Sequence, residues 1–253
     1  MTDERFQPIT PATREDYRDL VAPLADACWH EFMLHDPIAD RLWDDLFERF
    51  SDYQFGLLDT HTGKAAAMGN SLPLHWDGAP ADLPEGGFDW AMQQAVSDHE
   101  NALQPRTQCA IQIAIHPDHQ GLGLSTRMLQ MMRAIGISKG FTRLLAPIRP
   151  TQKSQYPLAS IDNYITWKND AGLPFDAWLR VHVRLGAQII KPCHESMDIR
   201  GTIADWERWT GMKFLESGEY FVPGALNPIQ VDLEADQAIY MEPNIWLVHP
   251  LQD

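Results

Sequence analysis

The residues best suited to chemistry in this chain lie in the run HPDHQGLGLS, from His116 to Ser125. Gly121 and Gly123 carry no side chain, so backbone N–H groups beside them can approach a ligand closely. A helical pattern begins at Leu124, and the first N–H groups of a helix have no partner inside it. The helix dipole adds partial positive charge at the same place. The run therefore favours binding of a phosphate or pyrophosphate, as strand–glycine loop–helix elements do in many nucleotide folds.

The elements that must position this loop are a strand before it and a helix after it. The strand runs from Cys109 to Ile115 and is almost wholly apolar, as expected when both faces of a sheet are covered. In the helix, apolar side chains recur three and four residues apart and form one face: Leu124, Met128, Met131, Met132 and Ile135.

Strands and helices are predicted along the whole chain. A strand from Phe6 to Ile9 is followed by a helix that Thr10-Pro11 opens and that continues to Cys28, and by a second helix from Pro37 to Phe50. Further strands are expected at 53–58, 64–74, 143–148, 187–190 with 197–199, 229–233 and 238–241. Further helices are expected at 88–103, 174–186 and 203–210.

Length and composition are those of an ordinary globular protein. The 253 residues are 22% charged and 44% hydrophobic, and no linker divides them, so we expect one domain over residues 1–253. No apolar run approaches the roughly 20 residues that a membrane span needs. The polar, acidic N-terminus resembles neither a signal nor a transit peptide, and the three unpaired cysteines argue against a disulfide framework or a zinc site. The cytoplasm is the expected location.

The charge balance restricts the partners. A formal net charge of −15 disfavours binding to nucleic acid or to an anionic membrane. It would suit a cationic amine as substrate through electrostatic steering, although an acidic surface that only keeps the protein in solution explains the charge as well.

The loop and the order of elements together resemble the GCN5-related N-acyltransferase (GNAT) superfamily. The signature of that family is Gln/Arg-x-x-Gly-x-Gly/Ala at the start of a helix. Gln120 and Gly123 occupy its first and fourth places, and Ser125 stands where Gly or Ala is usual. The resemblance extends over roughly residues 5 to 250. It implies an α/β (α+β) fold with a central mixed, largely antiparallel sheet flanked by helices, and insertions at about 75–105 and 150–180.

The resemblance also implies a binding site for acetyl-CoA or another acyl-CoA as co-substrate. Backbone groups of Ile113 and Ile115 would pair with the pantetheine arm like an added strand. The amides from Leu122 to Ser125 would hold the pyrophosphate. The complete set of expected coenzyme-binding residues is Ile113, Ile115, Gln120, Gly121, Leu122, Gly123, Leu124 and Ser125.

Acyl transfer to an amine needs an acid that protonates the leaving thiolate. In many relatives this acid is a Tyr four residues before the Gly of a Tyr-x-x-x-Gly-Phe element. The matching run here places His182 at the Tyr position and Ala187 at the Phe position. The resemblance thus makes His182 the candidate catalytic acid, although its apolar helix face also suits a histidine of the core. Tyr156 and Tyr164 are rival acids that could instead only pack.

The base that takes the proton of the amine is missing from its expected place. Some relatives carry a Glu on the signature strand where this chain has Cys109, which we interpret as a small buried apolar residue. A carboxylate acting through water, such as Glu85, Asp89 or Glu195, could substitute, or the amine could bind already neutral.

Two cations follow the strand that ends at Ile148. Arg149 is the candidate substrate-binding residue and, with Lys153, could bind an acceptor carboxylate or the phosphates of the coenzyme, or be an ordinary surface cation. Neither HPDH nor the group of His30, Glu31 and His35 has convincing metal-ligand spacing, so no metal is expected.

The first hypothesis is an acyl-CoA-dependent N-acyltransferase that transfers the acyl group directly to the amine of a small molecule. One alternative is an acyl-CoA-binding module with little or no catalysis. Another is an acyltransferase that uses carrier-protein thioesters. A homodimer is compatible with the sequence, which does not specify the oligomeric state.

Overall fold

The computed structural model describes residues 5–251, in which nine strands form one sheet. The strands are β1 (Phe6–Ile9), β2 (Gln54–Asp59), β3 (Lys64–Leu74), β4 (Thr107–Ile115), β5 (Arg143–Ile148), β6 (Gln188–Gly201), β7 (Gly218–Tyr220), β8 (Ile229–Asp232) and β9 (Gln237–Pro250). The helices are α1 (Tyr17–Val21), α2 (Pro23–Cys28), α3 (Pro37–Leu42), α4 (Asp45–Glu48), α5 (Gly87–Glu100), α6 (Leu124–Ser138), α7 (Ile161–Tyr164), α8 (Ala177–Arg184) and α9 (Ile203–Thr210).

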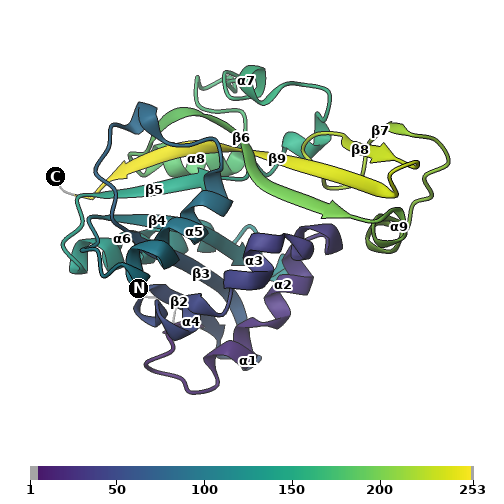
Figure 1. Ribbon diagram of the computed structural model, residues 1–253. Coiled ribbons are helices and arrows are strands. Elements are labelled where there is room, and N and C mark those ends of the chain that lie inside the picture. The colour runs from purple at the N-terminus through teal and green to yellow at the C-terminus, as the bar shows by residue number, and fades with distance from the viewer. Residues whose placement is uncertain (1–4, 252–253) are drawn as a thin grey trace.

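The strand order is β1-β2-β3-β4-β5-β9-β8-β7, with β6 paired to the other edge of β9 (Figure 1). All neighbours are antiparallel except β4 and β5, which are parallel. The predicted fold class, a mixed and largely antiparallel sheet with flanking helices, is confirmed. One domain over residues 1–253 stays a prediction, which the continuous sheet supports.

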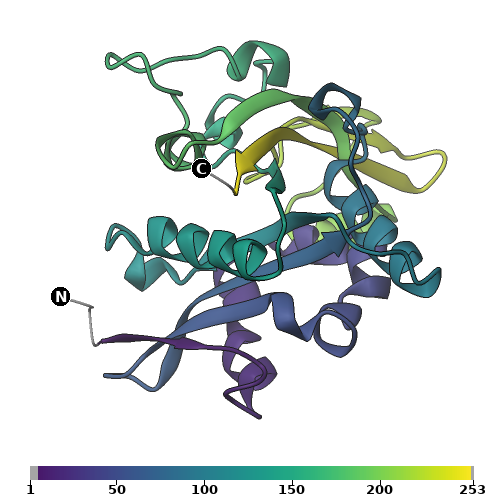
Figure 2. The same ribbon diagram turned by 90° about the vertical axis from the view of Figure 1, so that its left-hand side faces the viewer.

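Helices cover both faces of the sheet. Side chains of α6 and α8, among them Met128, Met132 and Leu179, form one buried cluster with β2, β4 and β5. On the other face, α3, α4 and α5 pack against β3, β4 and β9 through residues such as Leu46 and Met92. In Figure 2, β1 and the β6–β9 pair lie at opposite ends of the molecule, with α6 beside the middle of the sheet.

The two N-terminal helices are more broken than the sequence predicts. The expected helix up to Cys28 begins only at Tyr17 and is divided at Pro23, because proline removes an N–H and crowds the preceding turn. The expected helix 37–50 is divided into α3 and α4. The third difference is at α8, which begins at Ala177 and not at Pro174, with Asp176 as its N-cap.

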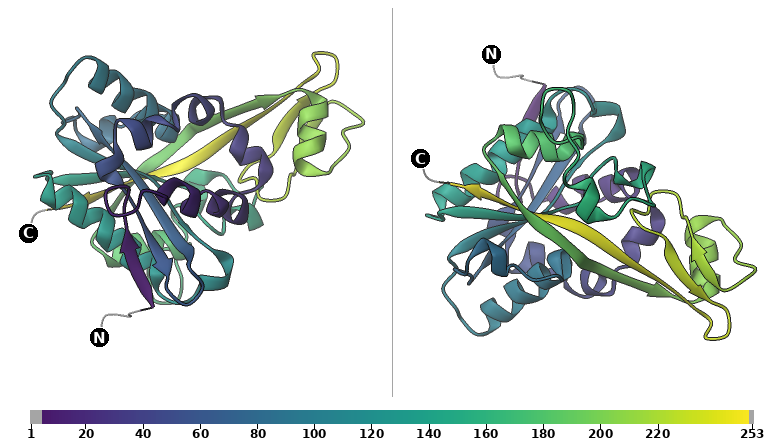
Figure 3. Two further views of the ribbon diagram at one scale, coloured as in Figure 1. Left: turned by 90° about the horizontal axis from the view of Figure 1, so that it is seen from below. Right: turned by 90° about the horizontal axis from the view of Figure 1, so that it is seen from above.

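The last strand is the largest departure from the predicted elements. It was expected over 238–241 but continues to Pro250, because its second half pairs with β5 on one side and β6 on the other. β6 is likewise one strand and not two short ones. Together they form a long arm, whose far end carries β7, β8 and α9 (Figure 3). A capping box formed by Thr202 and Asp205 begins α9.

β4 and β5 are paired only at their beginnings. The two residue pairs are Gln108 with Leu144 and Cys109 with Leu145, although both strands continue beyond them. Opposite β3, Ala110 faces Ser71 and Gln112 faces Asn70, which leaves Ile111 as the extra residue of a β-bulge. A bulge bends its strand and increases the local twist. The gap that opens between β4 and β5 therefore begins where the bulge lies.

Among residues 5–251, no helix is long and apolar enough to cross a membrane.

Candidate active site

A cavity of about 1000 Å³ occupies the gap between β4 and β5. One side of the cavity is lined by β4, the start of α6 and the inner face of α8. Its other side is lined by the segment from α2 to α3, by Arg149 and by Glu242 and Asn244 of β9. The cavity thus connects the predicted phosphate loop to a second compartment that can hold an acceptor.

The free edge of β4 faces this cavity. The N–H of His116 donates to the carbonyl of Ala66 on β3. Because backbone groups alternate in direction along a strand, those of Ile113 and Ile115 point away from β3, toward the gap. The carbonyl of Ile115 already accepts a hydrogen bond from Sγ of Cys28, at 3.4 Å. The structure therefore places both predicted residues where an extended chain could pair with the strand.

The glycine loop has the backbone that the sequence predicts. Gly121 and Gly123 have φ values of +77° and +76°, in the left-handed region that favours glycine. Gly123 is the N-cap of α6, and no side chain caps this helix. The first amides of α6 therefore have no capping partner and are available to an anion. Gln120, Gly121 and Ser125 line the cavity with them.

A buried ionic cluster holds this loop against the sheet. His119 lies directly before Gln120, and its Nε2 is 3.0 Å from Oδ2 of Asp59. Arg5 donates to both oxygens of the same carboxylate, at 3.1 and 2.8 Å. The hydrogen bond from Arg5 holds the pKa of Asp59 well below its usual range, so this carboxylate stays charged and fixes His119. The HPDH run thus anchors the loop.

Arg149 lies in the second compartment, paired with a buried carboxylate. Its Nε donates to Oε1 of Glu242 at 2.7 Å, and its Nη2 donates to the carbonyl of Gly224 at 2.5 Å. Tyr240 donates to the other oxygen of Glu242 at 2.8 Å, and Asn244 lies 3.3 Å from the first. Burial works against the charge of Arg149, but Glu242 and Tyr240 together outweigh it and raise the pKa of the guanidinium.

Lys153 is not a surface cation either. Its side chain is fully buried and donates to the carbonyls of Leu226 and Tyr156, at 2.6 and 3.1 Å. Burial lowers the pKa of this amine to about 8. It supports the wall behind the cavity and does not line it.

His182 lines the cavity from α8, in contact with a second histidine. Its Nδ1 lies 2.7 Å from Nε2 of His249, and the ring is buried against Trp178. Burial, with a smaller contribution from His249, lowers the pKa of His182 well below 6.5. A neutral imidazole can donate a hydrogen bond toward a leaving sulfur but carries no imidazolium proton. Its catalytic role stays a prediction.

The rival acids lie elsewhere. Tyr156 and Tyr164 belong to an aromatic cluster with Trp167 and Phe175. Tyr164 donates to Asp176 at 2.9 Å, and burial raises the pKa of its hydroxyl. Neither tyrosine lines the cavity, so the structure does not bring them to the predicted coenzyme site.

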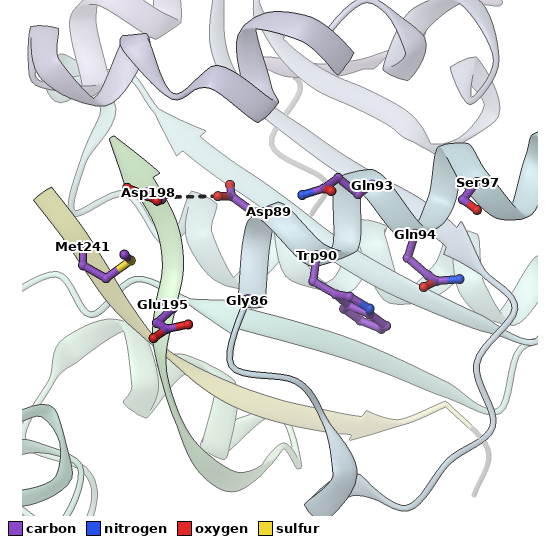
Figure 4. Close-up of a pocket in the computed structure, with 9 residues that line it drawn as sticks. All are labelled: Gly86, Asp89, Trp90, Gln93, Gln94, Ser97, Glu195, Asp198 and Met241. Carbon is purple, nitrogen blue, oxygen red and sulfur yellow. Dashed lines mark hydrogen bonds between the residues drawn. The ribbon is translucent and has the colours of Figure 1, made fainter. Parts of the chain in front are cut away.

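The three carboxylates considered as bases are also outside the cavity. Glu85 bonds His194 at 2.9 Å and lies near Lys191. Asp89 and Glu195 line a separate hollow of about 430 Å³, between α5 and the β6–β9 arm (Figure 4). Side chains alternate along a strand, so Met197 of β6 faces the large cavity while Asp198 faces this hollow.

Cys109 is fully buried, and burial raises the pKa of its thiol. It therefore packs as a small apolar residue, as the sequence predicts. Within residues 5–251, no group of three or more His, Cys, Asp or Glu side chains could hold a metal ion.

Sequence reasoning missed Glu242, Asn244 and His249. All three lie in the part of β9 that was not predicted as a strand. The available signal was the apolar run IWLV after Pro243-Asn244, which continues the pattern of a buried strand.

Comparisons with known proteins found relatives that match almost the whole chain. The chain is 30% identical, over 96% of its length and 93% of the relative's, to the arginine N-acetyltransferase avaD of Aspergillus versicolor. The loading GNATL domain of CurA from Lyngbya majuscula matches 98% of both chains with 20% identity and a TM-score of 0.65. The GNAT-like decarboxylase GphF, in complex with isobutyryl-CoA, covers 98% of this chain and 100% of its own, with 14% identity and a TM-score of 0.55. These two structures show the fold alone, and no protein-family model matches the chain.

The fold and the cavity define an acyltransferase that uses a coenzyme A thioester. The chain belongs to the GCN5-related N-acyltransferase superfamily. It is an acyl-CoA-dependent N-acetyltransferase that acts on a small-molecule amine. This favours the first hypothesis from the sequence over a binding module without catalysis.

Proposed function

We propose that the acceptor is a small amino acid whose carboxylate binds Arg149, with L-arginine as the first candidate. Arg149 uses Nε on Glu242 and Nη2 on Gly224, while Nη1 makes no hydrogen bond within residues 5–251. Its side chain is 19% exposed and lines the cavity. An unused guanidinium N–H group in a largely buried wall suits a carboxylate partner. This donor is the observation that carries the proposal.

Charge elsewhere in the cavity supports a cationic side chain on the acceptor. Asp40 of α3 is an exposed carboxylate that lines the same compartment. The net charge of −15 favours approach of a cation in general. Arginine carries both groups, and the relative from Aspergillus versicolor is named for its action on arginine.

The coenzyme half of the site is proposed from the residues that the sequence predicts. The free edge of β4 at Ile113 and Ile115 supports binding of the pantetheine arm. The uncapped start of α6 and the loop before it, residues Gln120 to Ser125, support binding of the pyrophosphate, and all of these except the exposed Leu122 line the cavity. A cytoplasmic location, a metal-free reaction and the absence of nucleic-acid and membrane partners remain predictions from the sequence.

The test compares L-arginine with agmatine, which is the same molecule without its carboxylate. We expect the wild-type chain to prefer arginine in kcat/KM by more than about tenfold, because agmatine leaves a buried donor unpaired. The measurement is release of free CoA thiol from acetyl-CoA, with the product identified by mass spectrometry.

The matched variant is the double substitution Arg149→Met with Glu242→Met. Removing both partners avoids a buried charge without a partner, which Arg149→Met alone would create. The variant should keep its activity toward agmatine and lose the preference for arginine. Equal rates with the two amines in the wild type, or a preference retained by the variant, would refute the proposed role of Arg149.

A further inference from the structure

The second compartment contains a histidine that no part of the coenzyme site uses. His30 follows α2 and is the N-cap of the 3-10 helix η1 (Glu31–His35). It lines the cavity beside Trp29 and Met33, on the side of Arg149 and Glu242. The residue is exposed to the cavity and solvent, and neither ring nitrogen makes a hydrogen bond within residues 5–251.

Two contacts fix the ring in place. It lies parallel to Phe32, with 6.0 Å between the ring centroids and 14° between the planes. It also fills the space beside Gly224, where a Cβ would lie 2.0 Å from Cδ2 and 2.2 Å from Nε2 of the ring. Nδ1 is therefore on the edge of the ring away from Gly224.

Gly224 connects this histidine to Arg149. The carbonyl of Gly224 accepts from Nη2 of Arg149, while its Cα side carries the imidazole of His30. One turn of backbone thus holds a cationic donor and an imidazole on the same wall of the acceptor compartment.

Charged groups of both signs lie around the ring. They are Arg149 with its partner Glu242, Glu31 next along the chain, which bonds His35, and Asp40 on α3. Partial burial, followed by the charge of Arg149, lowers the pKa of His30 below 6.5. At neutral pH the imidazole is unprotonated and can accept a proton.

We propose that His30 is the general base of the transfer reaction, with Nδ1 accepting the proton that the acceptor amine loses. A primary ammonium must lose two protons to become an amide. One goes to Nδ1 of His30 and then to solvent, which frees the lone pair with which the nitrogen forms the bond to the acetyl carbonyl carbon. The other goes to the sulfur of CoA when the carbon–sulfur bond breaks, so atoms and charges balance.

The central variant is His30→Phe, which keeps an aromatic ring against Phe32 and Gly224 but has no nitrogen. We expect kcat to fall about 100-fold, with the Kd for acetyl-CoA unchanged within about twofold. His30→Gln serves as a second variant if the phenylalanine is poorly accommodated. His35→Gln is the matched control, because His35 belongs to the same 3-10 helix, bonds Glu31 and does not line the cavity. It should retain wild-type kcat.

A second readout separates a base from a residue that only shapes the site. The acceptor is the amine that the wild type acetylates fastest in a panel that includes L-arginine, so the test does not depend on arginine being the substrate. The loss of kcat with this amine is compared with the loss of kcat with hydroxylamine, which is already unprotonated at neutral pH. The loss in His30→Phe should be at least about tenfold smaller with hydroxylamine.

Three results would overturn the assignment. They are a kcat of His30→Phe close to that of the wild type, an equal loss with both amines, or an equal loss in His35→Gln. If no amine is acetylated, hydrolysis of acetyl-CoA by the wild type and His30→Phe gives the same comparison, because water must lose a proton to the same base. If the chain acetylates another amine but not arginine, the acceptor proposed above is wrong. The measurements on His30→Phe then still test the role of His30.

Discussion

Nδ1 of His182 and Nε2 of His249 lie 2.7 Å apart, on α8 and β9, in a fully buried contact. With one proton between them, one nitrogen donates a hydrogen bond and the other accepts it, so both have a partner. The outer nitrogens, Nε2 of His182 and Nδ1 of His249, have no hydrogen-bond partner among residues 5–251. A second proton on this pair would place a charge in the core, so both rings are neutral at physiological pH.

This pair predicts a loss of stability in acid. Burial, with a smaller contribution from Arg133, lowers the pKa of His249 from 6.5 to about 4. Between those values the unfolded chain binds a proton that the folded chain excludes, so stability falls as the pH falls. At pH 4, the suppressed pKa of His249 lowers the free energy of unfolding by about 3 kcal/mol relative to neutral pH.

Urea unfolding at several pH values from 4 to 7 measures this effect. The variant His249→Gln should lose much of the pH dependence that the wild type shows in this window. His61→Gln, in an exposed turn, should leave it unchanged. An unaltered slope in His249→Gln would contradict the prediction.

His182→Ala is expected to lower turnover and to leave coenzyme binding nearly intact. The ring lines the cavity beside Trp178, so it can donate a hydrogen bond to the leaving sulfur. We expect kcat to fall about 10- to 100-fold, with the Kd for acetyl-CoA within about twofold. His249→Gln breaks the same pair without removing the ring that lines the cavity. An equal loss in both variants would mean that His182 acts only through the fold.

Gly123→Ala should weaken coenzyme binding more than it weakens the fold. The φ of +76° strains an alanine by about 1 kcal/mol, and the new methyl group would lie at the phosphate end of the cavity. Gly140 is a matched control, because its φ is +79°, it also has open space around a Cβ, and it lies beyond the other end of α6. Both variants should lose similar stability in denaturant titrations, whereas only Gly123→Ala should raise the Kd for acetyl-CoA. Equal Kd values would argue against the phosphate site.

Cys109→Ala should leave turnover within about twofold of the wild type, because the thiol is buried in the core and the reaction needs no enzyme nucleophile. A thiol reagent should modify the half-buried Cys28 before Cys109 in the folded chain. Early modification of Cys109, or loss of turnover in the alanine variant, would show that this strand contributes chemistry through its thiol.

The sequence by itself determined the local elements that carry the coenzyme loop. The strand up to Ile115, the glycines at positive φ, α6 and the Thr202–Asp205 capping box depend on periodicity, backbone freedom and contacts within a few residues. These signals lie within one stretch of chain, so they can be found without the fold. The same stretch provided the GNAT signature.

Only the tertiary structure decided the second compartment. The gap between β4 and β5 depends on a bulge at Ile111 and on pairing that stops after Cys109, and neither leaves a clear mark in the sequence. Glu242 meets Arg149 across 93 residues, and His249 meets His182 across 67. Pairing at such separations is set by how whole strands and helices pack against one another. The sequence therefore specifies the loop that we propose holds the donor, and the fold decides which side chains face the second compartment.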